Sequence, residues 1–450
     1  MNMTTLNTPL PEDLLKLKWN GQFKLMLEMI DLRLQKDIPT KLKERLELEK
    51  EIISRLPNDF IYSKEQALDI LHSKIQDFTN DEFEDLFKDS AFEWIYIEGQ
   101  MYFKNNFFEN LVKVRKSYAN RLIQKEEKTS TLLDDVMHKM KEEKDVLCKI
   151  HVKTSIEIDP KAQKPGKTIR VWLPIPKEYA QVEGLKILNI SHPHIVNNND
   201  VDQRCIYIEK EYEANETFSV EYEFINHMHY EELNPDIVTS DHPDCCLEQQ
   251  VPHIVFSDYL KAFTKEIIGN ETNPLLKAKK IYNYITSHVM YSYMRQYATL
   301  PCISEYVATG LKGDCGVQAL LFITLCRIAD IPATWQAGLY TTPESIGNHD
   351  WARFYIAPYG WLYADCSFGG SAYRAGNEER RDFYFGHLDP FRTPCSSKFM
   401  GDFVPSKTYL ACDPFDNQNG EAEYVDEAIP SPYILKKTEK IDIHILEEGK

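Results

Sequence analysis

The sequence lacks both an excess of basic residues and any long apolar run. Its 450 residues include 52 Lys and Arg against 70 Asp and Glu, which gives a formal net charge of −18 at pH 7. Proteins that bind nucleic acid without sequence preference need a basic face to neutralise phosphates, so this balance argues against that class. No run of about 18 apolar residues is available to span a bilayer. We therefore expect no nucleic acid and no membrane among its partners, and a solvated acidic surface.

The beginning of the sequence also lacks the uninterrupted apolar core of a secretion signal. Two prolines and two acidic residues interrupt it: Pro9, Pro11, Glu12 and Asp13. A cytoplasmic location is the resulting expectation. The ten cysteines show no paired spacing of the kind found in small disulfide scaffolds, so we expect most of them to be free thiols.

Residues 1–148 are predicted to form a helical region. One apolar stripe recurs at helical spacing and ends before Ile38-Pro39; it consists of Phe23, Met26, Leu27, Ile30 and Leu34. Two capping-box patterns, at Ser63 and Thr79, predict further helix starts. The aromatic-rich stretch 83–108 is interpreted as core packing, and the Lys- and Glu-rich stretch 125–149 as an exposed helix or linker.

Residues 149–232 are predicted to form a small antiparallel β-sandwich. From Ile150 the apolar residues alternate with polar ones, the two-residue repeat of a half-buried strand. Several such short strands follow, separated by turn sequences such as Pro165-Gly166. A last alternation at Ile441, Ile443 and Ile445 predicts a strand that returns to one of the sheets.

The next segment contains residue types that can ligate zinc: His227, His229, His242, Cys245 and Cys246. Structural zinc sites usually space paired ligands by two to four residues, and adjacent cysteines do not easily occupy two tetrahedral corners. A connecting loop is therefore the preferred interpretation, and we expect no metal and no organic cofactor.

Cys315 is the cysteine with a functional pattern around it. It lies in Gly313-Asp314-Cys315-Gly316, a turn flanked by glycines, and a long apolar run follows it. The turn places the cysteine on the first turn of a helix, where free N–H groups and the helix dipole favour the thiolate. The sequence thus predicts a nucleophilic Cys315 with a lowered pKa.

A base and an orienting acid follow downstream. His349 begins a predicted strand, Pro358-Tyr359-Gly360 makes a hairpin turn, and Asp365 ends the return strand. Opposed residues of an antiparallel pair lie roughly 5 Å apart, close enough for the carboxylate to accept the Nδ1–H of the imidazole. Asp350 is the less suitable orienting acid, because neighbouring residues on a strand point to opposite faces.

These three patterns, Gly-Asp-Cys-Gly, His-x-Trp and Trp-x-x-x-Asp in this order, resemble the catalytic core of the transglutaminase-like superfamily of papain-like cysteine enzymes. The resemblance covers roughly residues 255–370. It implies a nucleophile at Cys315, a general base and acid at His349 and an orienting group at Asp365. One departure is visible, since Cys366 and Ser367 follow the aspartate where the family often has Pro and Thr.

The overall expectation is an α+β protein whose residues 233–450 form a papain-like, transglutaminase-like catalytic domain with a C-terminal extension. The expected reaction is hydrolysis of a peptide or other amide bond, in a peptide or protein substrate, through a thioester at Cys315. The backbone N–H of Cys315 would stabilise the oxyanion, with Tyr291, Tyr293 or Gln296 as candidates for a second donor. True transglutamination and an unused triad in an interaction scaffold are the alternatives. The sequence leaves the substrate and the oligomeric state open.

Overall fold

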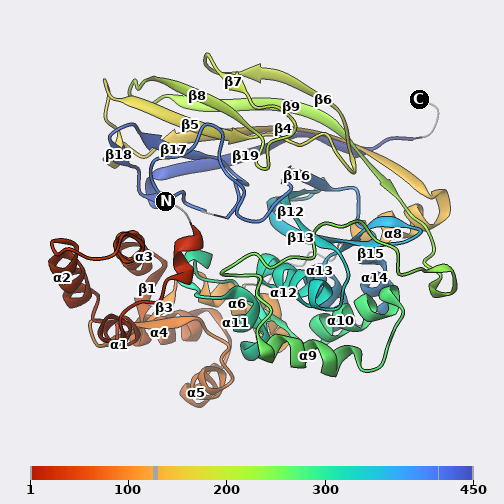
Figure 1. The fold of residues 1–450 in the computed structure, drawn as a ribbon, viewed down its shortest axis with the longest axis horizontal. Coiled ribbons are helices and arrows are strands. Elements are labelled where there is room, and N and C mark those ends of the chain that lie inside the picture. The colour runs from red at the N-terminus through yellow and green to blue at the C-terminus, as the bar shows by residue number, and fades with distance from the viewer. Residues whose placement is uncertain (1–2, 125–129, 414, 448–450) are drawn as a thin grey trace.

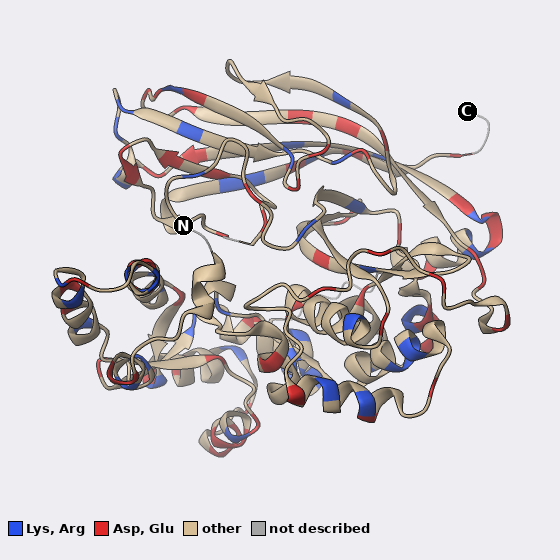
Figure 2. Cartoon of the chain, in the orientation of Figure 1, with Lys and Arg blue, Asp and Glu red and all other residues tan. Residues whose placement is uncertain are grey.

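The computed structural model describes residues 3–124, 130–413 and 415–447. Three parts lie side by side in it: a region of helices with a small sheet, a β-sandwich, and a core of helices packed on a five-stranded sheet (Figure 1). The α+β class expected from the sequence is confirmed. Basic and acidic residues are interspersed over all three parts (Figure 2).

The N-terminal region contains most of the predicted helices. They are η1 (Met3–Asn7), α1 (Glu12–Trp19), α2 (Phe23–Leu34), α3 (Thr40–Asp59), α4 (Lys64–Lys74), α5 (Asn80–Lys88), α6 (Phe107–Val114) and α7 (Lys116–Ala119). Helix α2 ends at Leu34, before the predicted break. Both capping boxes are present, with Ser63 capping α4 and Thr79 capping α5.

A three-stranded sheet in this region corrects the expectation of helices alone. Its strands are β1 (Phe60–Ser63), β3 (Gln100–Lys104) and β2 (Trp94–Ile97), in that order across the sheet. Glu98 and Gly99 form the two-residue turn between β2 and β3, both with positive φ, a conformation that Gly adopts without strain. The aromatic residues nearby form a buried cluster, as predicted, with Phe83, Phe92, Phe103 and Phe107 at its centre.

No helix within the described ranges is both long enough and apolar enough to cross a membrane. Helix α3 has 20 residues, but Lys, Arg and Glu side chains alternate with its leucines and isoleucines. Its apolar stripe packs inside the N-terminal region, where Leu46, Ile53 and Leu56 are buried.

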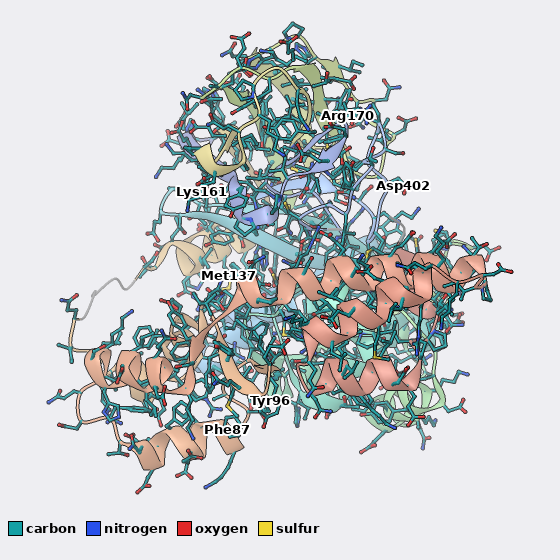
Figure 3. The ribbon with its side chains drawn as sticks, turned by 90° about the vertical axis from the view of Figure 1, so that its left-hand side faces the viewer. Phe87, Tyr96, Met137, Lys161, Arg170 and Asp402 are labelled. Carbon is teal, nitrogen blue, oxygen red and sulfur yellow. The ribbon has the colours of Figure 1, made fainter. Side chains whose placement is uncertain are left out.

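The predicted β-sandwich is present and consists of two antiparallel sheets. One sheet has the order β18-β17-β5-β8-β7 and the other β19-β4-β9-β6. The strands from the predicted segment are β4 (Asp145–Ile158), β5 (Thr168–Pro174), β6 (Val182–Ile190), β7 (Ile195–Val196), β8 (Cys205–Glu211) and β9 (Thr217–His229), with η2 (Pro160–Ala162) between β4 and β5. Figure 3 views the molecule from the left of Figure 1, with Lys161 and Arg170 on the sandwich and Phe87 and Tyr96 in the N-terminal region.

The C-terminal segment completes this sandwich. Strands β17 (Glu421–Tyr424), β18 (Glu427–Ala428) and β19 (Ile434–Ile445) join its two sheets, and η5 (Ser431–Tyr433) precedes β19. Ile443 pairs with Ile150 of β4, which confirms the predicted return of the last strand. Residues 421–445 are thus part of the sandwich, although the sequence grouped them with the catalytic region.

Helix α8 (Leu132–Glu143) connects the N-terminal region to β4. Its Val136, Met137 and Met140 are buried, so this part of the predicted exposed segment is an amphipathic helix packed on its neighbours. Residues 125–129 of that segment lie outside the described residues.

The third part is built around the buried helix α12 (Cys315–Ile328), which lies against a sheet of order β15-β14-β13-β12-β16 (Figure 1). The strands are β12 (Ala333–Thr341), β13 (Ile346–Ile356), β14 (Gly360–Ala364), β15 (Phe385–Gly386) and β16 (Arg392–Ser396). The helices around it are η3 (Pro235–Ile237), α9 (Asp258–Ile268), α10 (Pro274–His288), η4 (Tyr297–Thr299), α11 (Ile303–Gly310), α13 (Cys366–Arg374) and α14 (Glu378–Phe383). Two short strands, β10 (Met290–Tyr291) and β11 (Lys312–Gly313), pair in parallel just before α12. Because α12 is apolar on all sides, it can only be the centre of this part.

Candidate active site

Cys315 is the first residue of α12, as predicted. Asp314 caps the helix, since its carboxylate accepts the Val317 N–H at 3.2 Å and the Tyr297 hydroxyl at 2.5 Å. Gly316 has no room for a side chain, because a Cβ there would lie 2.3 Å from the Tyr297 oxygen and 2.6 Å from Asp350 Oδ2. Steric crowding therefore explains the glycine after the cysteine.

His349 and Asp365 form a buried hydrogen-bonded pair. The two side chains lie 2.7 Å apart, between His349 Nε2 and Asp365 Oδ2, with exposed fractions of 4% and 0%. The structure corrects the expected ring nitrogen, since Nε2 rather than Nδ1 faces the carboxylate. Nδ1 has no hydrogen-bond partner among the described residues, and the ring packs on Phe368 with 4.7 Å between centroids.

The charge of Asp365 fixes the protonation of the imidazole. Burial alone would raise the pKa of Asp365, but His349 and Arg392 outweigh it and hold that pKa at about 2. An ionised carboxylate only accepts hydrogen bonds, so His349 donates from Nε2 and its Nδ1 is the basic nitrogen. Burial also lowers the pKa of His349, which keeps the ring neutral at rest.

Arg392 on β16 is a buried partner of Asp365 that the sequence analysis missed. Its fully buried guanidinium lies 3.1 Å from Asp365 Oδ2 and 2.6 Å from Asp389 Oδ2. It also lies over the Phe368 ring at 4.5 Å. An arginine inside an otherwise apolar and aromatic stretch was the available signal, because a buried cation requires a buried carboxylate.

The Cys315 thiol lies closer to Asp350 than the sequence suggested. Its Sγ is 3.6 Å from Asp350 Oδ2, and within the described residues no hydrogen bond joins it to His349. Burial raises the pKa of this thiol well above its ordinary value, and the carboxyl groups of Asp350 and Asp314 raise it further. The expectation that the helix N-terminus lowers the pKa is therefore wrong for this structure, because burial and two acidic neighbours dominate.

Asp350 belongs to a buried group of acidic residues. Gln418 donates from Nε2 both to Asp350 Oδ1 and, at 3.3 Å, to Asp416 Oδ2. Burial raises the pKa of Asp350 and of Asp416 well above the ordinary range, and each carboxyl also disfavours ionisation of its neighbours. A shared proton between these two acids follows from their proximity.

The structure separates the three oxyanion candidates. Tyr291 and Tyr293 line one cavity with His349, and their rings contact each other with 5.6 Å between centroids. Gln296 lines a different cavity, beside Arg55 and Pro430, so the structure does not bring it to this site. Burial raises the pKa of the Tyr291 hydroxyl, and the nearby ionisable groups of Cys315 and Asp314 raise it further.

A cavity of about 890 Å³ opens beside His349. Tyr340, Asn348 and Phe368 line it from the core, and α6, α7 and α8 supply the opposite wall. Its volume is within the range of about 300–1,000 Å³ typical of ligand clefts. His349 therefore lines a cavity with the volume of a typical ligand cleft.

The residues considered as zinc ligands do not form a metal site in the described part of the chain. His227 and His229 instead contact Asp145, at 3.1 Å each, on the surface of the sandwich. Within residues 3–124, 130–413 and 415–447, no group of three or more His, Cys, Asp or Glu side chains is arranged to hold a metal ion.

Comparison with known proteins gives one match to a family. Residues 261–366, which contain Cys315, His349 and Asp365, match the transglutaminase-like superfamily. An uncharacterized protein of Haemophilus influenzae is 30% identical in an alignment of 141 positions that covers 25% of this chain and 37% of that protein. The chain thus spans little more than a third of the length of this relative.

Solved structures with some likeness were also found. A candidate cysteine protease from Cytophaga hutchinsonii is 14% identical, with 67% of this chain and 90% of that chain covered and a TM-score of 0.39. The periplasmic domain of TgpA from Pseudomonas aeruginosa is 12% identical, with 52% and 98% covered and a TM-score of 0.27. The family match, and the order of Cys315, His349 and Asp365 within it, identify residues 261–366 as a transglutaminase-like core.

Proposed function

We propose that this chain is a cysteine hydrolase that cleaves a peptide or other amide bond through a thioester at Cys315. The observation that carries the proposal is the His349–Asp365 pair at 2.7 Å, with the free Nδ1 of His349 at a cavity that also reaches Tyr291. A histidine oriented by a buried carboxylate and open on its other nitrogen is the arrangement of a general base.

The resting state in this mechanism is a neutral thiol and a neutral imidazole. Burial favours both neutral forms, which supports activation by His349 during the reaction over a preformed ion pair. The thiol first turns from Asp350 towards His349 Nδ1. Hydrogen bonds at active sites are often long without substrate and shorten only in the complex, so this step does not require a Cys315–His349 hydrogen bond in the substrate-free protein.

The proposed reaction is an acyl transfer from the amide to the sulfur and then to water. His349 Nδ1 accepts the thiol proton while the sulfur bonds to the amide carbonyl carbon. The C–N bond breaks, the amine leaves with that proton, and a water attacks the thioester to release the acid and restore the thiol. The N–H of Cys315 is the first oxyanion donor in this proposal, and the hydroxyl of Tyr291 or Tyr293 is the second.

A peptide library incubated with wild type and Cys315→Ala tests this function. We expect wild type to cleave a subset of peptides and Cys315→Ala to lose roughly 10⁴-fold or more of that activity, as when a triad nucleophile is removed. Mass spectrometry scores cleavage, deamidation and, with an added amine, incorporation, which separates hydrolysis from transglutamination.

The control is Cys245→Ala, because Cys245 is an exposed cysteine outside the core helix. It should retain full activity and an unchanged melting temperature. Full activity of Cys315→Ala would refute the mechanism, and an inert wild-type protein would favour the interaction scaffold.

A further inference from the structure

The cavity beside His349 differs in charge from the rest of the chain. Five basic residues line it, and no Asp or Glu does: Lys113, Arg115, Lys116, Arg374 and Arg380. The whole sequence, by contrast, has a net charge of −18, and residues of both signs are interspersed along the chain (Figure 2). A positive cavity on an acidic protein concentrates small anions locally, while the rest of the surface repels large polyanions.

Arg374 is the half-buried basic residue of this cavity for which the described residues supply no counter-charge. It is half-buried at the end of α13, the helix that begins directly after Asp365. Among the described residues its guanidinium has neither a hydrogen-bond partner nor a carboxylate. Burial lowers the pKa of Arg374, and no acidic group opposes that effect. A desolvated cation without a partner is costly, so such a group at a cavity indicates a site for an anion.

The other four basic residues divide into two kinds. Arg115 is paired with Asp89, and Arg380 with Asp134 at 2.9 Å, so their charges are compensated. Lys113 and Lys116 are exposed and have no carboxylate partner in the described part of the chain. Lys113 lies over the rings of Tyr291 and Tyr293, at 4.1 Å and 4.7 Å from their centroids, and thus reaches the triad side of the cavity.

We infer that this cavity binds a carboxylate of the substrate, with Arg374 as its principal ligand and Lys113 as the second, so that the enzyme acts on acidic peptides. The inference rests on the proposed function. A planar guanidinium matches a carboxylate with two parallel hydrogen bonds. Tyr340 and Phe368 also line the cavity and offer apolar surface for the carbon atoms next to that carboxylate.

Alkylation of Cys315 by iodoacetate and iodoacetamide tests the anion site directly. In both reactions the thiolate sulfur bonds to carbon, iodide leaves, and the thiol proton passes to base. The reagents differ in one carboxylate, so the ratio of their rates reports anion binding near the sulfur. We expect saturation kinetics with iodoacetate alone, measured by mass spectrometry of the peptide that contains Cys315.

The variants compare Arg374 with a distant arginine. Arg374→Gln should lower the iodoacetate-to-iodoacetamide ratio by about tenfold, the loss of one charge-assisted hydrogen bond. Lys113→Gln should lower it less, and Arg374→Lys should restore part of it. Arg170→Gln is the matched control, since Arg170 is also half-buried but lies on the sandwich (Figure 3). Its ratio should equal that of wild type.

Protection experiments identify the source of the carboxylate. N-acetylglutamate α-amide presents a side-chain carboxylate, and N-acetylalanine presents a terminal one. Protection of Cys315 by either, lost in Arg374→Gln, supports the inference and tells which kind of acidic peptide fits.

Two results would overturn the inference: an unchanged ratio in both Arg374→Gln and Lys113→Gln, or no protection by either compound. Lys113→Gln keeps the test valid if Arg374→Gln fails to fold, because Lys113 is exposed. If wild type does not cleave the peptide library but alkylation by iodoacetate still shows saturation kinetics, the proposed hydrolysis fails and the anion site stands.

Discussion

The Cys315 sulfur lies beside a carboxyl group, and that neighbour influences when the thiol ionises. Asp350 follows His349 on β13, but its side chain leaves the other face of the sheet and meets the start of α12. Together with Asp416 and Gln418 it forms a buried acidic group next to the nucleophile. Burial and these carboxyl groups therefore favour the neutral thiol of Cys315.

Replacement of Asp350 by Asn should make Cys315 more reactive at low pH. Burial is the larger cause of the raised thiol pKa, and the negative charge of Asp350 adds to it. Removal of that charge should therefore lower the thiol pKa and move the midpoint of iodoacetamide labelling to lower pH. Labelling of Cys315 against pH, followed by mass spectrometry, measures the shift. Asp69→Asn, an exposed acid on α4, is the matched control and should leave the midpoint unchanged.

The same variant should change how stability depends on pH. A carboxyl whose pKa is raised by folding stabilises the protein while protonated, and this contribution is lost as pH rises through the raised pKa. Wild type should therefore lose free energy of unfolding as pH rises above the ordinary Asp pKa of about 3.9, and Asp350→Asn should lose less. An equal loss in both proteins would show that Asp350 ionises freely, contrary to its burial.

Helix α6 carries the contact between the N-terminal region and the active site. Asn110 is buried on this helix, and its Oδ1 accepts the Tyr293 N–H at 2.8 Å. One turn further on, Lys113 covers the tyrosine rings. The N-terminal region therefore forms a wall of the cavity and fixes the segment that carries two oxyanion candidates.

Asn110→Ala should weaken the contact between α6 and the segment that contains Tyr293. It leaves the Tyr293 N–H without a partner, which should reduce the free energy of unfolding by about 1–3 kcal/mol. Urea denaturation measures the loss, and the iodoacetate preference of Cys315 should fall as well. Asn120→Ala, an exposed asparagine after α7, should change neither quantity. Stability equal to wild type in Asn110→Ala would mean that this contact does not hold the regions together.

Segments from both ends of the chain pack against the other parts of the molecule. The N-terminal region packs beside α12, and the C-terminal strands close the sandwich, so the core of residues 261–366 lies between parts from both ends of the chain (Figure 1). Strand β19 covers one edge of β4 along nearly its full length. Its removal would expose an unpaired strand edge, a known cause of aggregation.

A chain that ends before Ile434 should be much less stable than the full chain. Ile434 and Ile443 are buried in the sandwich, and the loss of each contributes about 1.5–3 kcal/mol. We expect a lower melting temperature by circular dichroism and faster proteolysis between residues 149 and 230. Removal of residues 448–450 alone leaves β19 intact and should have no effect. An unaltered melting temperature in the shorter chain would show that β19 is dispensable.

The sequence by itself determined the elements around Cys315, His349 and Asp365. The glycines and the apolar run define α12, and the hairpin of β13 and β14 brings His349 and Asp365 together within 16 residues. Both patterns lie within short segments of the sequence. Within such a segment, periodicity and turn residues decide which face of a helix or strand is buried. The same local rules placed the capping boxes and most strands of the sandwich, but they overlooked the sheet β1-β3-β2 and its turn at Glu98-Gly99.

Only the tertiary structure decided which distant residues surround that centre. Arg392 behind Asp365, Asp350 against the Cys315 sulfur, Gln418 beside Asp350 and Lys113 over the tyrosines all depend on how separate elements pack. A hydrophobic pattern indicates that a face of an element is buried but not which residues cover it. The pKa shifts of buried groups depend on those covering residues. The helix N-terminus alone therefore predicted a lowered pKa for Cys315, whereas burial and the packed carboxylates raise it.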